Sequence, residues 1–383
     1  MEQVSVDIGS AEKWAKNWLM SVALPYWHEV GLDKVHGGSF EAMNMQGEPL
    51  VDMTRRFRVQ ARQVYAFAHA YDLGWRPGLE AMRSPLEYML KHCWLETGGW
   101  GHLYSRDGRC VNDTVDTYDQ AFALLGLGWA YKVSGDKKIY DAAQQTKDFL
   151  FTNLRHPRGG FKENLNDDIP LRRANPHMHL FETAMWWMEL HQDEQMADLA
   201  SEIFGLFNTH FCIDGLLREY FNSDLSPLVE TAEAKYHYLE PGHLLEWASL
   251  LRKYKQLTGR ASEFTDYMEK FSDQYGMEAA TGLVMNQCLT TGGAIPISKA
   301  RLWPQTEYIR IKLLSNDVKD VRQGLVMLDR LKTIFLTVDG DIRGYWFDEV
   351  DSIGRATSNS APASTLYHVI GALLPLIEES GVS

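Results

Sequence analysis

The chain has 383 residues, a formal net charge of −13 and an apolar content of 45%. Such an acidic chain disfavours nucleic acid and anionic membranes as partners. Because no apolar stretch reaches about 18 residues, no membrane span is expected. The four cysteines are scattered without a CxxC pair, and the N-terminus has no basic segment followed by an apolar run. Both features favour a cytoplasmic protein without disulfides or a signal peptide.

Six copies of a short glycine-centred turn divide the chain into segments of similar length. The apolar period between the turns is that of helices. A spacing of roughly sixty residues holds two helices and a turn. The lead glycines of the six turns are Gly37, Gly98, Gly159, Gly215, Gly282 and Gly340.

The helical period predicts twelve helices, and a glycine turn follows every odd-numbered one. We expect them at residues 10–29, 54–73, 77–94, 113–134, 137–154, 177–191, 194–211, 241–258, 261–277, 300–315, 317–336 and 360–379.

The predicted helices alternate in character along the chain. Even-numbered helices such as 113–134 are apolar almost all round, as an inner ring requires, whereas odd-numbered ones such as 137–154 carry a polar face. We therefore predict an all-α fold, an (α/α)6 barrel with short β-turn segments at its mouth. An open solenoid is the alternative, but it would need polar capping repeats that we do not find. Since no linker or low-complexity segment interrupts the repeat, we expect one domain spanning 1–383.

Polar residues stand near the start of each inner helix, where an apolar core would not place them. The turn-bearing loops emerge beside these helix N-termini, which favour anions and hydrogen-bond acceptors. A pocket at this mouth is the natural site. Its candidate residues are Arg58, Arg62, Asp116, Tyr118, Asn175, His179, His243, Glu246, Trp303, Glu307 and His368.

Two of these segments have spacings that indicate chemistry. His243 and Glu246 are i and i+3, and a carboxylate beside an imidazole raises its pKa and orients it for acid/base work. A buried structural pair explains the same spacing equally well. Trp303 and Glu307 are i and i+4, an aromatic plate next to a carboxylate as in many sugar sites. Packing with a salt bridge is the alternative there, and His368 alone in an apolar helix is typical of a core residue.

No motif in the chain indicates a metal or a cofactor. His177 and His179 are one residue apart and point in different directions on a helix, and no HExxH, Asp/His cluster or CxxC supplies a third ligand. GxxxxGK[ST], GxGxxG and GxSxG are absent, so ATP, dinucleotide and serine-hydrolase chemistry have no support.

Five segments in chain order resemble the N-acylglucosamine 2-epimerase superfamily, which includes cellobiose 2-epimerases, mannose isomerases and sulfoquinovose isomerases. They are Arg58–Tyr65, Asn175–Glu182, Glu240–Trp247, Arg301–Glu307 and Leu366–His368. The resemblance implies an (α/α)6 barrel and metal-free interconversion at C1 and C2 of a reducing sugar. It also implies acid/base roles for His243 and His368 and stabilisation of the reacting oxygens by Arg62. The positions it implies for binding or ring opening are His179, Glu246, Trp303 and Glu307, with Asn175 as a further sugar contact.

One departure from the family pattern bears on the substrate. Cellobiose 2-epimerases carry a tryptophan five residues before the last histidine, where this chain has Ala363. That tryptophan forms a wall for a disaccharide, so its absence favours a monosaccharide and the isomerase branch. We therefore expect mannose–fructose isomerisation, with lyxose–xylulose as a side reaction, through a cis-enediolate formed by His368 with His243 as its partner. Neutral imidazoles acting as bases predict activity that rises as the pH passes about 6.5.

Other functions stay open at this point. Epimerisation at C2 needs two bases on opposite faces of the sugar, and both histidines are present. Sulfoquinovose would need extra cations near C6, for which Arg172, Arg173 and Arg218 are available. A glycoside hydrolase could use Asp116, Glu246 and Glu307, and a non-catalytic binding protein is the remaining alternative. The oligomeric state cannot be predicted from these features.

Overall fold

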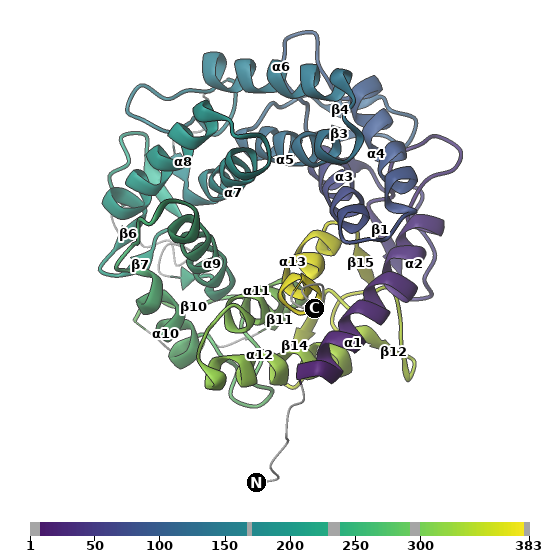
Figure 1. Cartoon of the computed structure of the whole chain (residues 1–383), viewed down its shortest axis with the longest axis vertical. Helices are drawn as coiled ribbons and strands as arrows, with labels where there is room; N and C mark the ends of the chain where they lie inside the picture. The colour runs from purple at the N-terminus through teal and green to yellow at the C-terminus, as the bar shows by residue number, and fades with distance from the viewer. Residues whose placement is uncertain (1–7, 167–170, 229–237, 292–298, 379–383) are drawn as a thin grey trace.

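The computed structural model describes residues 8–166, 171–228, 238–291 and 299–378. Its helices form two concentric rings (Figure 1). The inner ring closes because its last helix packs against both its predecessor and its first helix. The inner helices are α3 (Phe57–Asp72), α5 (Thr117–Ser134), α7 (Ala174–His191), α9 (Pro241–Thr258), α11 (Leu302–Leu313) and α13 (Thr365–Glu378).

The outer ring contains the helices with a polar face, as predicted. Three of them change winding near their C-terminal ends, where π-helical segments occupy Leu19–Ala23, Phe207–Phe211 and Leu331–Leu336. The outer helices are α1 (Ile8–Trp18) with α2 (Leu24–Glu29), α4 (Gly78–His92), α6 (Lys137–Asn153), α8 (Glu194–Leu206), α10 (Thr265–Tyr275) and α12 (Val318–Arg330). The (α/α)6 barrel is therefore confirmed. Residue 379 of the last predicted helix and the N-terminal residues 1–7 lie outside the described ranges.

Each glycine turn closes a small antiparallel hairpin after an outer helix. All six lead glycines have positive φ, between 64° and 88°, a region that glycine adopts without a Cβ clash. Two of the hairpins are strand pairs, β6 (Cys212–Ile213) with β7 (Leu216–Leu217) and β12 (Thr337–Val338) with β13 (Asp341–Ile342). The other four are single bridges, Leu32–Ser39, Trp94–Trp100, Arg155–Phe161 and Met277–Val284.

A short strand stands just before five of the six inner helices. These are β2 (Arg55–Arg56), β5 (Leu171–Arg173), β9 (Tyr238–Leu239), β11 (Lys299–Arg301) and β15 (Ser360–Pro362). They pair antiparallel, in the same order, with β3 (Leu103–Tyr104), β8 (Tyr220–Asn222), β10 (Cys288–Leu289), β14 (Glu349–Asp351) and β1 (Ala42–Asn44), while β4 (Cys110–Asn112) extends the β2–β3 pair.

Five predicted helices begin two or more residues later than expected. Those expected from residues 54, 113, 261, 300 and 360 begin at Phe57, Thr117, Thr265, Leu302 and Thr365. Ladder hydrogen bonds keep the residues before α3, α11 and α13 extended. For α5 the reason is a cap, because the Asp116 carboxylate accepts a hydrogen bond from the Asp119 backbone N–H at 2.6 Å.

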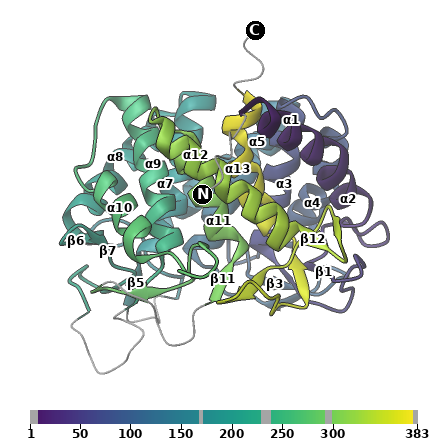
Figure 2. The same cartoon turned by 90° about the horizontal axis from the view of Figure 1, so that it is seen from below.

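The two ends of the barrel are built differently. Strands and long loops gather at the end where the inner helices begin, which Figure 2 shows from the side. At the other end the connections are short. Gly135 and Gly259 terminate α5 and α9 in the left-handed conformation, and Asp136 and Asp193 cap the helices that follow α5 and α7. The loop-bearing end is therefore the mouth.

The space between the rings is filled by aromatic and aliphatic side chains. Trp27, Trp100, Trp187 and Trp247 are among the largest fully buried ones. Across the described ranges, no helix combines the length and the apolar character that crossing a membrane requires. All four cysteines are free thiols, in agreement with the expectation from their spacing.

Candidate functional site

A cavity of about 440 Å³ opens at the mouth of the barrel, and we call it the mouth cavity. All six inner helices contribute to it from their N-terminal ends. Eight of the predicted residues line it: Arg62, Tyr118, Asn175, His179, His243, Glu246, Trp303 and His368. Its other lining residues are Arg56, Arg173, Tyr220, Glu240, Arg301, Asp348, Pro362, Ser364 and Thr365.

His368 on α13 is held by a buried carboxylate. Its Nδ1 lies 2.8 Å from Oε1 of Glu307, whose Oε2 lies 3.6 Å from a guanidinium nitrogen of Arg310. Burial, together with the positive charge of Arg62, lowers the pKa of His368 well below 6.5, so the ring is neutral. A neutral ring that donates from Nδ1 to a carboxylate keeps its lone pair on Nε2. His368 is therefore arranged as a base.

His243 on α9 has the opposite protonation state. Its Nδ1 lies 2.7 Å from Oε1 of Glu219 and 3.7 Å from Oε2 of Glu240. Burial lowers the pKa of His243, but the negative charges of Glu219 and Glu240 outweigh it and raise the pKa to about 10. The ring is thus an imidazolium at neutral pH and can act as an acid.

Asn175 faces the second nitrogen of this imidazolium. The amide nitrogen Nδ2 of Asn175 lies 3.2 Å from Nε2 of His243. The amide oxygen Oδ1 of Asn175 is buried without a hydrogen-bond partner in the described part of the chain. A protonated ring donates from both nitrogens. The amide oxygen of Asn175 is therefore the group that suits Nε2 of the charged ring.

Trp303 on α11 contacts both histidines. The centroid of its ring lies 5.2 Å from that of His243 and 5.5 Å from that of His368, with a tilt of 38° to each. The two histidines are 9% and 7% exposed and line the same cavity. One neutral and one charged imidazole thus flank an indole on a shared wall.

Two more titratable groups line the inner part of the mouth cavity. His179 is neutral because burial lowers its pKa to about 4. Burial and the charges of Glu307 and Glu182 raise the pKa of Glu246 well above 4.5, which favours its protonated form. Nδ1 of His179 lies 3.7 Å from Glu182 and 4.0 Å from Glu246. His179 and Glu182, three residues apart on α7, therefore lie close together, but Nδ1 of His179 has no hydrogen-bond partner among the described residues.

Arg62 on α3 brings a positive charge to this site. It donates a hydrogen bond to the hydroxyl of Tyr118 at 2.8 Å, and its guanidinium lies over the rings of Phe122 and Tyr367 at 4.2 and 5.1 Å. No carboxylate of the described residues is within ion-pair distance of it, and the side chain is 7% exposed. Such a cation favours a ligand that develops negative charge.

Several buried polar atoms around the cavity lack hydrogen-bond partners among the residues that the structure describes. They are Nε of Arg62, Oδ1 of Asn175, Nδ1 of His179, Oε1 of Glu246 and Oε2 of Glu307. Buried polar groups are almost always paired in native proteins. This set therefore suits a ligand with many hydroxyl groups.

Three of the candidate site residues, Arg58, Asp116 and Glu307, do not line the mouth cavity. Arg58 donates to Asp119 at 2.7 Å and to Asp116 at 2.9 Å, and His102 lies 2.7 Å from Asp119. The Arg58 guanidinium sits 4.3 Å from the ring centroid of Tyr118, which does line the cavity. Asp116 therefore holds Arg58, and Arg58 packs against the ring of Tyr118.

The sequence interpretation missed Glu219, the carboxylate that holds His243. It expected Glu246 in that role, but the fold brings Glu219 from the preceding turn to hydrogen-bonding distance. A signal was present, because three of the turns carry a glutamate four residues after the lead glycine. In the other two turns the glutamate holds an arginine. Glu41 accepts from the backbone N–H and Nε of Arg56, and Glu163 accepts from the same two groups of Arg173.

The fold assembles groups that could hold a metal ion, which the residue spacing did not indicate. With candidate ligand atoms within 4.8 Å of one another, the groups are His102–Asp116–Asp119, His179–Glu182–Glu246 and Glu246–Glu307–His368. In the first group Arg58 donates to both aspartates, and in the third a guanidinium nitrogen of Arg310 lies 3.6 Å from Glu307, which also bonds to His368. Guanidinium groups therefore already supply positive charge beside the carboxylates of these two groups.

His177 has a structural role away from the cavity. Its Nε2 accepts from the backbone N–H of Phe161 at 3.0 Å, and its Nδ1 lies 2.9 Å from the carbonyl oxygen of Arg173. Only His179 of this pair lines the mouth cavity. The two rings thus diverge, as their spacing on a helix predicts.

Comparison with known proteins gives a consistent answer. Residues 38–372 match the family model for N-acylglucosamine 2-epimerase. A mannose-6-phosphate isomerase of Rhizobium meliloti (strain 1021) is 34% identical over 380 residues, covering 94% of this chain and 95% of the relative.

Solved structures agree on the fold. The crystal structure of a D-mannose isomerase superposes with a TM-score of 0.86 at 18% identity, over 99% of this chain and 100% of that one. The cellobiose 2-epimerase of Spirochaeta thermophila DSM 6192 gives a TM-score of 0.85 at 18% identity, over 100% of both chains. The chain therefore belongs to the N-acylglucosamine 2-epimerase family of sugar isomerases and epimerases, and it is an isomerase.

Proposed function

We propose that the mouth cavity interconverts mannose and fructose by moving protons between His368, His243 and the sugar. The observation that carries this proposal is the opposite protonation of the two histidines on one wall. Ala363 supports a monosaccharide, because a small buried residue stands where the disaccharide epimerases that the chain resembles have a tryptophan. A likeness to a D-mannose isomerase supports the choice of sugar.

The ring of the sugar must open first. Neutral His179 takes the proton of the anomeric hydroxyl, and Glu246 in its protonated form, which burial favours, gives one to the ring oxygen. The C1–O5 bond breaks as the C1 carbonyl forms. The two side chains lie 4.0 Å apart and can restore their protonation states by exchanging that proton.

Isomerisation of the open chain then uses both histidines. Nε2 of His368 removes the proton on C2, and the C–H electron pair forms the C1–C2 double bond while O1 takes a proton from His243. In the second half, O2 returns a proton to His243, the C2 carbonyl forms, and C1 takes the proton from His368. The net change moves one hydrogen from C2 to C1 and one from O2 to O1.

Arg62 and Trp303 act on the sugar without exchanging protons. Arg62 has no carboxylate partner among the described residues, so its charge is available to the sugar oxygens that gain negative charge as the C2 proton leaves. Trp303 offers an aromatic face beside both histidines, against which the apolar face of the sugar can pack.

The test is to incubate the protein with mannose and to identify the first product. We expect fructose. If glucose forms first, the proton returns to the opposite face of C2 and the enzyme is a 2-epimerase. If no product forms although mannose binds, the proposed chemistry is wrong.

A phosphorylated sugar is a second candidate, favoured by arginines at the rim. Arg56, Arg173 and Arg301 line the mouth cavity with side chains 41%, 38% and 38% exposed. Arginine forks suit phosphate and sulfonate groups. The relative with the mannose-6-phosphate isomerase name points the same way.

Substrate preference separates these candidates. The kcat/KM values for mannose, mannose 6-phosphate and sulfoquinovose should be compared in the wild type and in Arg173→Met. Arg83→Met, which removes an exposed arginine outside the cavity, is the matched control. Loss confined to the anionic sugars in Arg173→Met would establish the second candidate, whereas mannose as the best substrate, with equal values in both variants, supports the first.

A further inference from the structure

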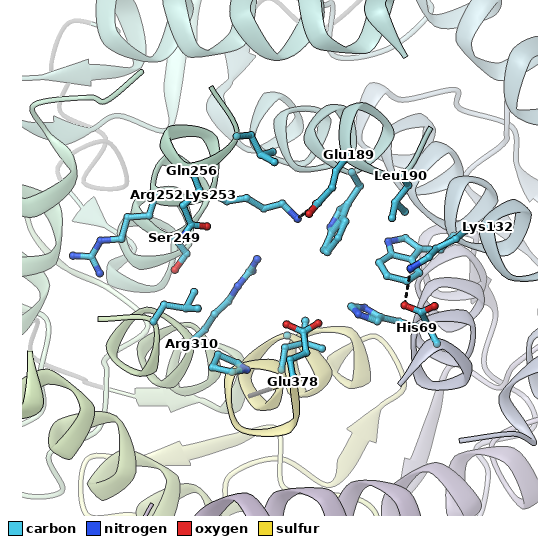
Figure 3. Close-up of a pocket in the computed structure, with 18 residues that line it drawn as sticks. His69, Lys132, Glu189, Leu190, Ser249, Arg252, Lys253, Gln256, Arg310 and Glu378 are labelled. Atoms are coloured by element: carbon cyan, nitrogen blue, oxygen red, sulfur yellow. Dashed lines mark hydrogen bonds and ion pairs between the residues drawn. The ribbon is translucent and has the colours of Figure 1, made fainter. Parts of the chain in front are cut away.

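A second cavity, of about 360 Å³, opens at the opposite end of the barrel, and we call it the far cavity. All six inner helices line it with residues from their C-terminal halves, whereas the mouth cavity uses their N-terminal ends. Figure 3 shows Lys253 from α9 and Arg310 from α11 both pointing into it, with Glu189 beside the lysine. The proposed isomerase mechanism uses none of its lining residues directly.

Two matching triads build the wall of the far cavity. Nζ of Lys253 lies 2.7 Å from Glu189 and 3.0 Å from the ring centroid of Trp186. Nζ of Lys132 lies 2.6 Å from Asp72 and 4.7 Å from the ring centroid of Trp129. Each ammonium group thus contacts one carboxylate and one indole.

Hydrogen-bond donors are in excess around this cavity. Its charged lining residues are four cations, Lys132, Arg252, Lys253 and Arg310, and three carboxylates, Asp72, Glu189 and Glu378. Three donors of lining residues, the indole N–H groups of Trp129 and Trp186 and the hydroxyl of Ser249, are buried without a partner in the described ranges. Trp129 and Ser249 are each 2% exposed. A bound group rich in acceptors would satisfy this set.

The lowered pKa of Lys253 indicates that its ammonium group would be stabilised by further negative charge. Burial lowers its pKa to about 8, and the nearby Arg310 lowers it further, while Glu189 opposes both. A bound anion would offset the cost of burying this ammonium group.

We propose that the far cavity binds a small oxyanion of the phosphate class between Lys253, Lys132 and Arg310. The anion comes either as free phosphate or as a phosphate ester, since the volume leaves room for a small organic group. Lysine and arginine together are the usual partners of such groups.

Arg310 joins this site to the catalytic one. It lines the far cavity, and its guanidinium also lies 3.6 Å from Glu307, which holds Nδ1 of His368. Burial raises the pKa of Glu307 to about 7, and the charge of Arg310 restrains that rise. An anion that shares Arg310 raises this pKa further, so more Glu307 is protonated at pH 7. His368 then loses a charged acceptor and becomes a weaker base.

Binding is tested by calorimetric titration of the whole protein with inorganic phosphate and, separately, with glycerol 3-phosphate. We expect one site per chain. Lys253→Met should weaken binding about tenfold, the loss of one charge-assisted contact. Lys255→Met is the matched control, because it removes the same charge from an exposed position on the same helix outside the cavity. The tighter of the two ligands identifies the source of the anion.

Coupling is tested by kinetics, and this arm rests on the proposed isomerase function. At pH 7 phosphate should lower kcat without raising KM in the wild type and in Lys255→Met. Phosphate should leave the kcat of Lys253→Met unchanged. Without phosphate, the activity of Lys253→Met should stay within about twofold of the wild type. At pH 9 the inhibition should fade, since Glu307 is ionised with or without the anion. Thermal melting confirms that both variants fold.

Clear results would overturn the proposal. Phosphate that does not bind the wild type, or that binds Lys253→Met equally well, removes the site. Inhibition that is purely competitive with the sugar assigns phosphate to the mouth cavity. If no isomerase activity is found, the calorimetric result still decides whether the far cavity binds the anion.

Discussion

The two cavities lie on one axis and share the same six helices, yet their polar groups are held in different ways. In the mouth cavity, loops reach the helices from outside, so that Glu219 in a hairpin orients His243 on α9. In the far cavity, the lysines pair with carboxylates of neighbouring helices, as Lys253 on α9 does with Glu189 on α7. The mouth can therefore keep two histidines in opposite protonation states, while at the far end each lysine has one carboxylate of a neighbouring helix beside it. Long loops at one end of a ring of helices are what allow the proposed catalytic site there.

Replacing His368 by asparagine should give the largest difference between the two ends. The variant keeps a polar side chain but lacks the base, so kcat should fall about a thousandfold. Lys253→Met at the far end should change the uninhibited kcat by no more than about twofold. Steady-state kinetics on both variants measure the contrast, and similar losses in both would show that the two cavities are not functionally distinct.

Arg62→Met should have the next largest effect. Its guanidinium is the cation without a carboxylate partner in the described mouth cavity, so its removal should cost about 3 kcal/mol of transition-state stabilisation, or roughly a hundredfold in kcat. KM should change much less, because the charge on the sugar oxygens develops only in the transition state. A variant with an unchanged kcat and a raised KM would assign Arg62 to ground-state binding.

Glu219→Gln should change the pH profile more than the maximal rate. In the wild type, activity should rise near pH 7 as Glu307 loses its proton and fall near pH 10 as His243 loses its own. This expectation replaces a limb at pH 6.5 assigned to a histidine, because burial lowers the pKa of His368 well below 6.5. Without the charge of Glu219 the pKa of His243 drops, so the alkaline fall should move toward neutral pH. An alkaline limb that does not move would separate Glu219 from the acid.

Removing metal ions should have the smallest effect. Arginine side chains already provide positive charge beside the histidine–carboxylate groups of the mouth, so dialysis against a chelator should leave kcat within about twofold. Loss of activity that a divalent ion restores would instead assign a metal to one of those groups.

Much of the fold follows from residues that act locally. Each lead glycine adopts a positive φ, and this requirement makes the turn recognisable in the sequence. The strands before the inner helices escaped prediction because segments such as Lys299–Arg301 are too short to show an alternating pattern. Their partners, such as Glu349–Asp351, are distant in the sequence.

The candidate site was likewise predictable only where it follows from local sequence and helix order. His243, His368 and Trp303 stand near the N-termini of helices, so their convergence follows from the topology. The partnership of Glu219 with His243 depends on how a loop returns to the barrel, and the glutamate four residues after the lead glycine marks the position without identifying its partner. The far cavity was missed because cations such as Lys132 in the last turn of a helix are ordinary companions of its dipole.

The central claim, that one imidazole is neutral and the other charged, can be measured directly. Nitrogen-15 NMR of histidine-labelled protein, with His243→Asn and His368→Asn to assign the signals, reports the protonation of each ring as the pH is raised. We predict that His368 is neutral at pH 6.5 and above, and that His243 stays an imidazolium until about pH 10. Two rings that titrate together near pH 6.5 would contradict the account.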